Sequence, residues 1–138
     1  TLWRWAMVVG EQTLPVAARG VDGRIYPWGN DWHPLRCSSR QGGPGLTTPV
    51  GQYSPTGDSP YGCADMAGNV WEWCHSLYRD YPYRDDDGRE DSEAEGDRVL
   101  RGGSTGSHQR DVRCAFRSSL NPSSRHGNFG FRVVVTPV

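Results

Sequence analysis

The chain has 138 residues, of which 35% are hydrophobic, and its six Trp and six Tyr place much apolar area in few side chains. These numbers predict one folded domain over residues 1–138 and exclude a disordered chain, while 18 Gly and 10 Pro predict a body built largely of turns. A net charge of −1 offers no basic footprint for nucleic acid. We find no signal peptide or membrane-spanning apolar run, so we expect no membrane insertion and, by default, a cytoplasmic location.

The first sixty residues predict little regular structure. Residues 2–9, LWRWAMVV, are of types common in strands, and Gly10 ends the run. Residues 14–19, LPVAAR, predict a short helix that Gly20 closes. Residues 21–62 show no sustained period and are typical of closely spaced turns that pack through their aromatic side chains.

The second half predicts three strands and one charged loop. The alternating segment VWEWC at 70–74 predicts a strand, and RVLRGG at 98–103 and FRVVVTPV at 131–138 predict two more. Residues 85–98 form an acidic run, which we expect to be a solvated excursion. The first and last strands are the longest apolar runs, so we expect them to pair and close the domain.

The four cysteines are spaced neither as C-x-x-C nor, with the four His, as a zinc site. The spacing favours free buried thiols, and a disulfide pair stays open as the alternative. The cysteines are Cys37, Cys63, Cys74 and Cys114.

Six segments of this sequence resemble the formylglycine-generating-enzyme-like family, also called the sulfatase-modifying-factor domain. The resemblance runs in order from about Ala17 to Val135. It implies an α+β, C-type-lectin-like fold that is rich in loops, with short antiparallel strands, paired terminal strands and one or two short helices. The segments are YPWGN (26–30), TTPVGQY (47–53), SPYGCADMAGNVWEWC (59–74), RVLRGGS (98–104), VRCAFR (112–117) and GFRVV (130–134).

The chain departs from the family at its beginning. Family members usually carry a whole N-terminal half before this region, and here only AARG at 17–20 matches the segment that would join the two. The resemblance therefore describes an N-terminally shortened member, or a fragment whose missing half a partner chain or an oligomer would replace.

The resemblance also implies which catalytic groups to seek. The family's oxidase holds copper between two cysteines. The first of these positions is Ser107 here, and the second falls where the chain is shortened and holds only Gln109, Arg110 and Asp111. Cys114 matches a structural cysteine. Because a hydroxyl cannot replace a thiolate as a soft copper ligand, we expect no enzyme activity of this kind and no copper.

A sister branch, the sulfoxide synthases, binds iron through an H-x-x-x-H-x-E helix. The four His give no such motif, so we expect no iron either. The alternative left open is an oxidase or sulfoxide-synthase-like domain that a missing N-terminal half completes.

One metal site of the family is matched position by position. A structural Ca²⁺ would be bound by the carboxylates of Asp65 and Glu72 and by the carbonyls of Gly68 and Val70. Hard oxygens of this kind are the ligands that Ca²⁺ prefers. The alternative is that Asp65 caps a turn and that Glu72 pairs with an Arg.

Residues 101–134 interleave family-like framework segments with small polar residues. This pattern resembles the variable proteins of diversity-generating retroelements, in which miscopied adenines scatter AAC and AAT codons to many residue types. In the framework, Val112, Phe116 and Phe131 are expected to anchor the core, so that the positions between them share one exposed face. The candidate variable region is 104–132, and its expected ligand-binding residues are Thr105, Ser107, His108, Arg110, Asp111, Ser118, Ser119, Leu120, Ser123, Ser124, His126, Asn128 and Phe129.

The sequence thus predicts a non-catalytic module that binds a protein or other macromolecular ligand through a variable surface. Small polar and aromatic residues are also typical of antibody loops. An ordinary surface without a ligand, on a structural accessory domain, is the remaining alternative.

Overall fold

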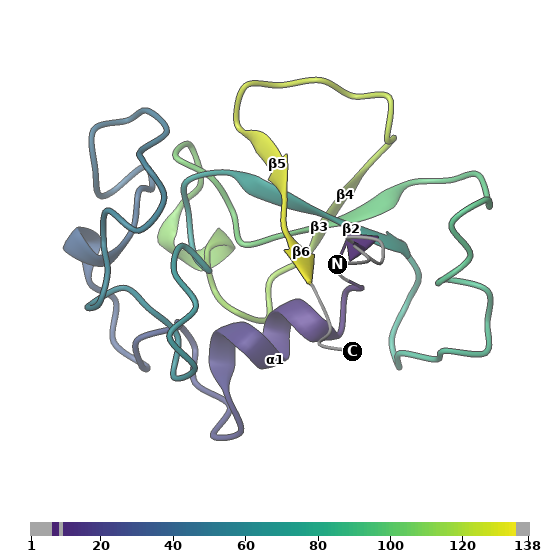
Figure 1. Cartoon of the computed structure of the whole chain (residues 1–138), viewed down its shortest axis with the longest axis horizontal. Coiled ribbons are helices and arrows are strands. Elements are labelled where there is room, and N and C mark those ends of the chain that lie inside the picture. The colour runs from purple at the N-terminus through teal and green to yellow at the C-terminus, as the bar shows by residue number, and fades with distance from the viewer. Residues whose placement is uncertain (1–6, 9, 135–138) are drawn as a thin grey trace, which may run out of the picture.

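The computed structural model describes residues 7–8 and 10–134 (Figure 1). Residues 2–6, 9 and 135–138 of the two expected terminal strands lie outside the described residues. The structure is α+β, with one short α-helix and long stretches of turn, as the composition predicts. Its elements are β1 (Met7–Val8), α1 (Thr13–Arg19), the 3-10 helix η1 (Pro34–Arg36), β2 (Trp71–Leu77), β3 (Arg98–Arg101), the 3-10 helix η2 (Gln109–Asp111), β4 (Ser118–Leu120), β5 (Phe129–Phe131) and β6 (Val133–Val134).

Four strands form a mixed sheet in the order β4-β3-β2-β5. β2, β3 and β4 are antiparallel neighbours, whereas β5 pairs with β2 in parallel, with Gly130 opposite Glu72. The prediction of antiparallel strands is therefore wrong for β5. Because β4 and β5 both run in the direction of β2 and lie at opposite edges, their connection must cross a face of the sheet. We call this connection, residues 121–128, the arch; in Figure 1 it lies on the side of the sheet away from α1.

The two terminal strands pair antiparallel, with Met7 opposite Val134 and Val8 opposite Val133. This confirms, for the described residues, that the ends of the chain close the domain. The four residues lie far apart in sequence, so the pair fixes the first and last segments to each other.

The described part of the predicted strand over 131–138 is broken at Arg132. The guanidinium of Arg132 donates to both carboxylate oxygens of Glu72, at 2.6 to 3.1 Å, and this side chain leaves the strand pattern to reach it. Phe131, which we expected to anchor the core, is 68% exposed. The prediction is correct for Val112, which is buried, while Phe116 is half-buried with its ring against that of Trp71.

The strand β2 separates two environments because its side chains alternate between the faces of the sheet. Trp71, Trp73 and His75 are half-buried, and the residues between and after them are buried. On the buried face, α1 packs through Leu14 and Ala18. The core cluster there consists of Leu14, Ala18, Met66, Cys74, Val99 and Cys114.

The turns between α1 and β2 pack around aromatic rings, as expected. Tyr26 stacks on Trp28 with ring centroids 5.4 Å apart, and Trp32 tilts against both. Val112 is buried in the same cluster. This second cluster connects the turn region to the segment before β4 and holds η2 in place.

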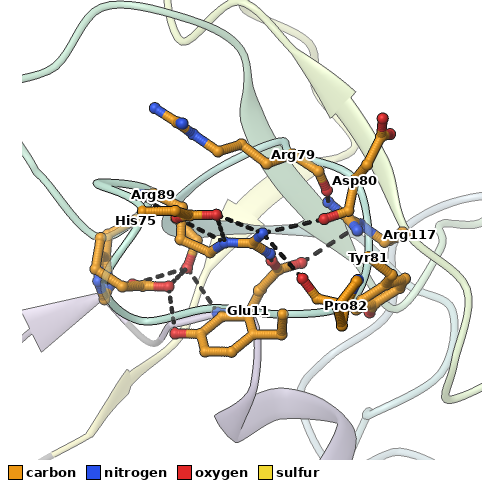
Figure 2. A network of polar contacts seen from close by, with 12 residues as sticks. Glu11, His75, Arg79, Asp80, Tyr81, Pro82, Arg89 and Arg117 are labelled. Carbon is orange, nitrogen blue, oxygen red and sulfur yellow. Dashed lines mark hydrogen bonds and ion pairs between the residues drawn. The ribbon is translucent and has the colours of Figure 1, made fainter.

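A buried carboxylate lies beside the sheet, on the segment that precedes α1 (Figure 2). Glu11 is 0% exposed, and its carboxylate contacts the guanidinium groups of Arg89 at 3.0 Å, Arg117 at 3.4 Å and Arg101 at 3.6 Å. Its backbone N–H donates to the hydroxyl of Ser76 at 2.9 Å. Three basic side chains from three segments therefore share one buried negative charge.

Most acidic residues of the run at 85–98 are exposed, as expected of a solvated excursion, but its two arginines are buried. Residues 78–97, which we call the excursion, fold around two arginines. Arg89 is 1% exposed and binds Asp87 and the carbonyls of Asp80 and Pro82, in addition to Glu11. The acidic run thus surrounds its own counterion, and the Arg89 guanidinium lowers the pKa of Asp87 to about 2.

The second arginine, Arg98, closes the base of the excursion. Its guanidinium donates to four backbone carbonyls, those of His75, Asp91, Ser92 and Ala94. Arg117 also contacts the excursion: its guanidinium lies over the rings of Tyr78 and Tyr81, at 4.2 and 4.6 Å from their centroids. These contacts tie the excursion to the sheet.

All four cysteines are free thiols in the structure, as the spacing favoured. Burial raises the pKa of Cys74 to about 12 and the pKa values of Cys37 and Cys114 to about 11. These three side chains are packing groups held in the protonated form. Among the described residues, no helix has the length and apolar character needed to cross a bilayer.

Candidate functional site

The predicted ligand-binding residues gather in two places, and the arch is the first. Its hydrogen bonds are local: Ser123 and Ser124 donate backbone N–H groups to Asn121, and Arg125 donates to the carbonyls of Pro122 and Ser124. Most of its residues, from 121 to 127, are exposed. Side chains here can therefore change with little effect on the rest of the fold.

The arch is fixed where it enters β5. The carbonyl of Asn128 accepts from the backbone N–H of Trp71 at 2.8 Å, and its side chain donates to the hydroxyl of Ser104 at 3.1 Å. Phe129, expected to be exposed, is half-buried with its ring 5.7 Å from that of Trp73 and 4.9 Å from that of His126. Asn128 and Phe129 thus act as the framework end of the arch.

The second place is the turn of residues 104–111, which we call the η2 turn because η2 ends it. Gln41 holds this turn from outside the predicted region: its side chain bonds to the ring of His108 at 3.1 Å and accepts from the N–H of Gln109 at 3.0 Å. Together with Arg110 they line a hollow of about 240 Å³. The bond between the side chains of Asn128 and the buried Ser104 connects the η2 turn to the framework end of the arch.

Ser107 does not belong to the exposed face on which it was expected. It is 7% exposed, and its hydroxyl accepts the N–H of Ser104 at 2.9 Å. Its carbonyl also accepts from the N–H of Arg40 at 3.0 Å. Ser107, which the resemblance aligns with the family's first copper-binding position, is therefore part of a buried turn.

The remaining predicted ligand-binding residues lie on β4 and at the ends of the η2 turn. Ser118, Ser119 and Leu120 form the edge strand β4 and are half-buried, with Leu120 opposite Arg98. Thr105 and Asp111 are half-buried at the two ends of the η2 turn.

The four predicted calcium ligands line one cavity of about 230 Å³. The donor set fits Ca²⁺ in kind, since Asp65 and Glu72 bring carboxylates and the neighbouring turn brings backbone oxygens. The contacts of the alternative are present as well: Asp65 accepts the N–H of Gly51 at 2.7 Å, and Arg132 holds Glu72. Calcium therefore stays a prediction, and any bound ion would share Glu72 with Arg132.

In the part of the chain that the structure describes, no group of three or more His, Cys, Asp or Glu side chains gathers as a metal site. The expectation that copper and iron are not used stays a prediction.

Residues 9–137 match the family model described as "Sulfatase-modifying factor enzyme 1-like domain". The chain belongs to this family. Among curated relatives, it is 39% identical over 153 residues to the formylglycine-generating enzyme of Streptomyces coelicolor, covering 94% of this chain and 47% of that protein. It is 35% identical over 146 residues to the inactive C-alpha-formylglycine-generating enzyme 2 of Bos taurus, covering 94% and 44%. The family thus includes enzymes and a member named inactive.

Two solved structures are similar to this chain in fold. Treponema denticola variable protein 1 superposes with a TM-score of 0.76 at 26% identity, covering 91% of this chain and 46% of that one. PvdO from Pseudomonas aeruginosa gives a TM-score of 0.72 at 25% identity, covering 91% and 51%. The C-type-lectin-like fold and the family resemblance are confirmed. The chain spans about half the length of these relatives or less.

Several residues of the surface could not be chosen from the sequence. Gln41 lies 67 residues from His108 in the chain, and no local pattern connects them. Trp73 and Arg98 belong to family segments that indicated strands, and nothing in those segments showed which face the arch would cross. The one signal in the sequence was the segment 121–128, which joins two strands. The sequence did not show that these two strands lie at opposite edges of the sheet.

Proposed function

We propose that this chain is a non-catalytic binding module, in which the arch and the η2 turn contact a protein or other macromolecular ligand. The observation that carries the proposal is the separation of roles along residues 104–132. Exposed positions of the arch bond to one another, whereas the family segments around them supply the buried contacts, such as those of Val112 and Arg101. A surface of this kind can vary without unfolding its support.

The similarity to Treponema denticola variable protein 1 supports the further proposal that this surface is diversified. The test is to sequence the DNA around the gene together with many copies of the segment encoding residues 104–132. We expect a second copy of the segment that differs only where it carries adenines, beside a reverse-transcriptase gene. A segment that is single-copy and invariant would overturn diversification.

The alternative of an oxidase has its own support, since the Streptomyces coelicolor relative is named a formylglycine-generating enzyme. Against it, Ser107 occupies the position of the first copper ligand and its hydroxyl is engaged by Ser104. The test is to incubate the copper-loaded protein with a cysteine-containing peptide, using the Streptomyces coelicolor enzyme as the positive control. Formation of formylglycine above the rate without protein would overturn the non-catalytic proposal.

Calcium would act as a support of the surface. The carboxylates of Asp65 and Glu72 would bind the ion together with the carbonyls of Gly68 and Val70. Ca²⁺ would supply a fixed positive charge beside β2, the strand that carries Trp71 and Trp73. We propose a structural role because the cavity lies beside β2 and β5, close to the framework end of the arch.

A further inference from the structure

A groove lies between the arch and the sheet. It has a volume of about 340 Å³, within the range of small-ligand sites. It is lined by the half-buried Trp73 and His75 of β2 and by Arg98 of β3. Pro122 and Arg125 of the arch and Ser92 of the excursion line it as well.

The charges of the groove are unbalanced. Arg98 and Arg125 donate only to backbone carbonyls, and no carboxylate of the described residues forms an ion pair with either of them. His75 is already paired with Glu90. Arg98 is buried and its guanidinium is bound by four backbone carbonyls, so the exposed Arg125 is the positive charge that the groove offers to a ligand beside the ring of Trp73.

The neighbouring acids do not form ion pairs with the arginines of the groove. Asp91 and Glu93 flank Ser92, but neither lines the groove. The carboxylate of Asp91 accepts the N–H of Glu93 at 2.9 Å, and that of Glu93 accepts the hydroxyl of Ser92 at 3.3 Å. Their bonds are made within the excursion, and among the described residues no carboxylate contacts Arg125.

We propose that this groove binds an aromatic side chain that is flanked by a carboxylate on a protein ligand. The inference rests on the proposed function, since it names the chemistry that the binding surface accepts. The aromatic ring packs on Trp73 and Pro122, and the carboxylate lies near the guanidinium of Arg125, which forms strong charge-assisted hydrogen bonds with such groups.

The groove is lined partly by framework residues of the family and partly by residues of the candidate variable region. Trp73 and Arg98 belong to the framework segments of the family, whereas Pro122 and Arg125 lie in the candidate variable region. The floor would thus supply an anchor common to all variants, and the arch would select among ligands that carry the anchoring group. The contact between Arg125 and the ligand's carboxylate is the part of the binding that a substitution in the variable region would remove.

The test uses two probes that differ in charge alone, acetyl-Asp-Phe-amide and acetyl-Asn-Phe-amide, titrated into the ¹⁵N-labelled full chain. Trp73 gives a separate indole N–H signal in the spectrum, which Trp73→Phe assigns. We expect this signal to shift and the Asp peptide to bind about fivefold more tightly than the Asn peptide, because one charge-assisted bond is gained. The difference should shrink at 0.5 M salt, where the Debye length is only about 4 Å.

Matched variants locate the charge. Arg125→Gln should remove the difference between the two peptides, and Arg113→Gln should keep it. Both arginines are exposed and donate only to backbone carbonyls, so the same spectra should show that both variants stay folded. Equal affinities for the two peptides, shifts confined to the η2 turn, or no binding at all would overturn the proposal. These results do not depend on whether the gene is diversified, so the groove and the proposed function fail separately.

Discussion

The buried carboxylate of Glu11 gives the sharpest test of how the fold is held together. Glu11→Gln keeps the shape of the side chain and removes its charge. Arg89 would retain Asp87 as a partner, but Arg101 and Arg117 have no other carboxylate in contact among the described residues. The variant therefore leaves two buried guanidinium groups with no negative charge beside them.

The expected cost follows from the burial of these groups. Removing one partner of a buried ion pair destabilises proteins by about 3–5 kcal/mol. For a domain of this size each kcal/mol lowers the Tm by about 3 °C, so we expect the Tm to fall by about 10–15 °C. Thermal unfolding followed by circular dichroism measures this. Limited proteolysis should show earlier cleavage within residues 78–97, because Arg89 connects the excursion to Glu11.

The control is Asp22→Asn. Asp22 also pairs with an arginine, Arg24, at 2.6 Å, but this pair lies at the surface, where charges are screened by water and salt. We expect no measurable change of Tm. If Glu11→Gln lowers the Tm by less than about 3 °C, or if the two variants lower it equally, the three arginines do not need the buried charge and the reasoning is refuted.

Three further predictions concern the calcium cavity, the thiols and the framework. Addition of Ca²⁺ after EDTA treatment should raise the Tm by several degrees, and Glu72→Gln should abolish this increase; an unchanged Tm in the wild type would contradict the calcium site. Because burial raises the pKa of Cys74 to about 12 from the 9.0 of a free thiol, the unfolded chain loses this proton first, so stability should be full below pH 9 and fall between about pH 9 and 12, as urea unfolding at each pH would show. At pH 8 iodoacetamide should label only Cys63 in the native protein. Gly68→Ala should lower the Tm strongly, since its Cβ would lie 2.1 Å from the Ser38 carbonyl at a φ of +76°, whereas Gly127→Ala in the arch, with nothing within 4 Å, should leave it unchanged.

The sequence predicted those parts of the fold that depend on local pattern. The alternation of VWEWC placed β2, and Gly20, with a φ of +65°, ended α1 as expected. The family segments indicated the fold class and the pairing of the terminal strands. They could not show the parallel pairing of β5, because the direction of a strand in the sheet depends on the path of the arch.

The misplaced residues share one physical cause, a partner that is remote in the chain. Arg89 looked like part of a solvated acidic run, yet its partner Glu11 lies 78 residues away. Arg132 leaves the last strand for Glu72, 60 residues earlier. Ser107 has a residue type typical of exposed turns, and only the folded turn shows that its hydroxyl is used by Ser104. Patterns of charge and polarity cannot identify such partners.

The same contacts refine which positions of residues 104–132 can vary freely. Changes at exposed positions without special contacts usually alter stability by less than about 0.5 kcal/mol, whereas loss of a buried hydrogen-bond partner costs about 1–3 kcal/mol. Gly127 belongs to the first group, since it lies in the exposed part of the arch and a Cβ added there would meet nothing within 4 Å. Ser107 and Asn128 belong to the second, because each bonds to Ser104 and holds the η2 turn to its neighbours. If the segment is diversified, substitutions at Ser107 and Asn128 should therefore be the narrowest among folded variants, even where the mechanism of copying scatters their codons as widely as the others.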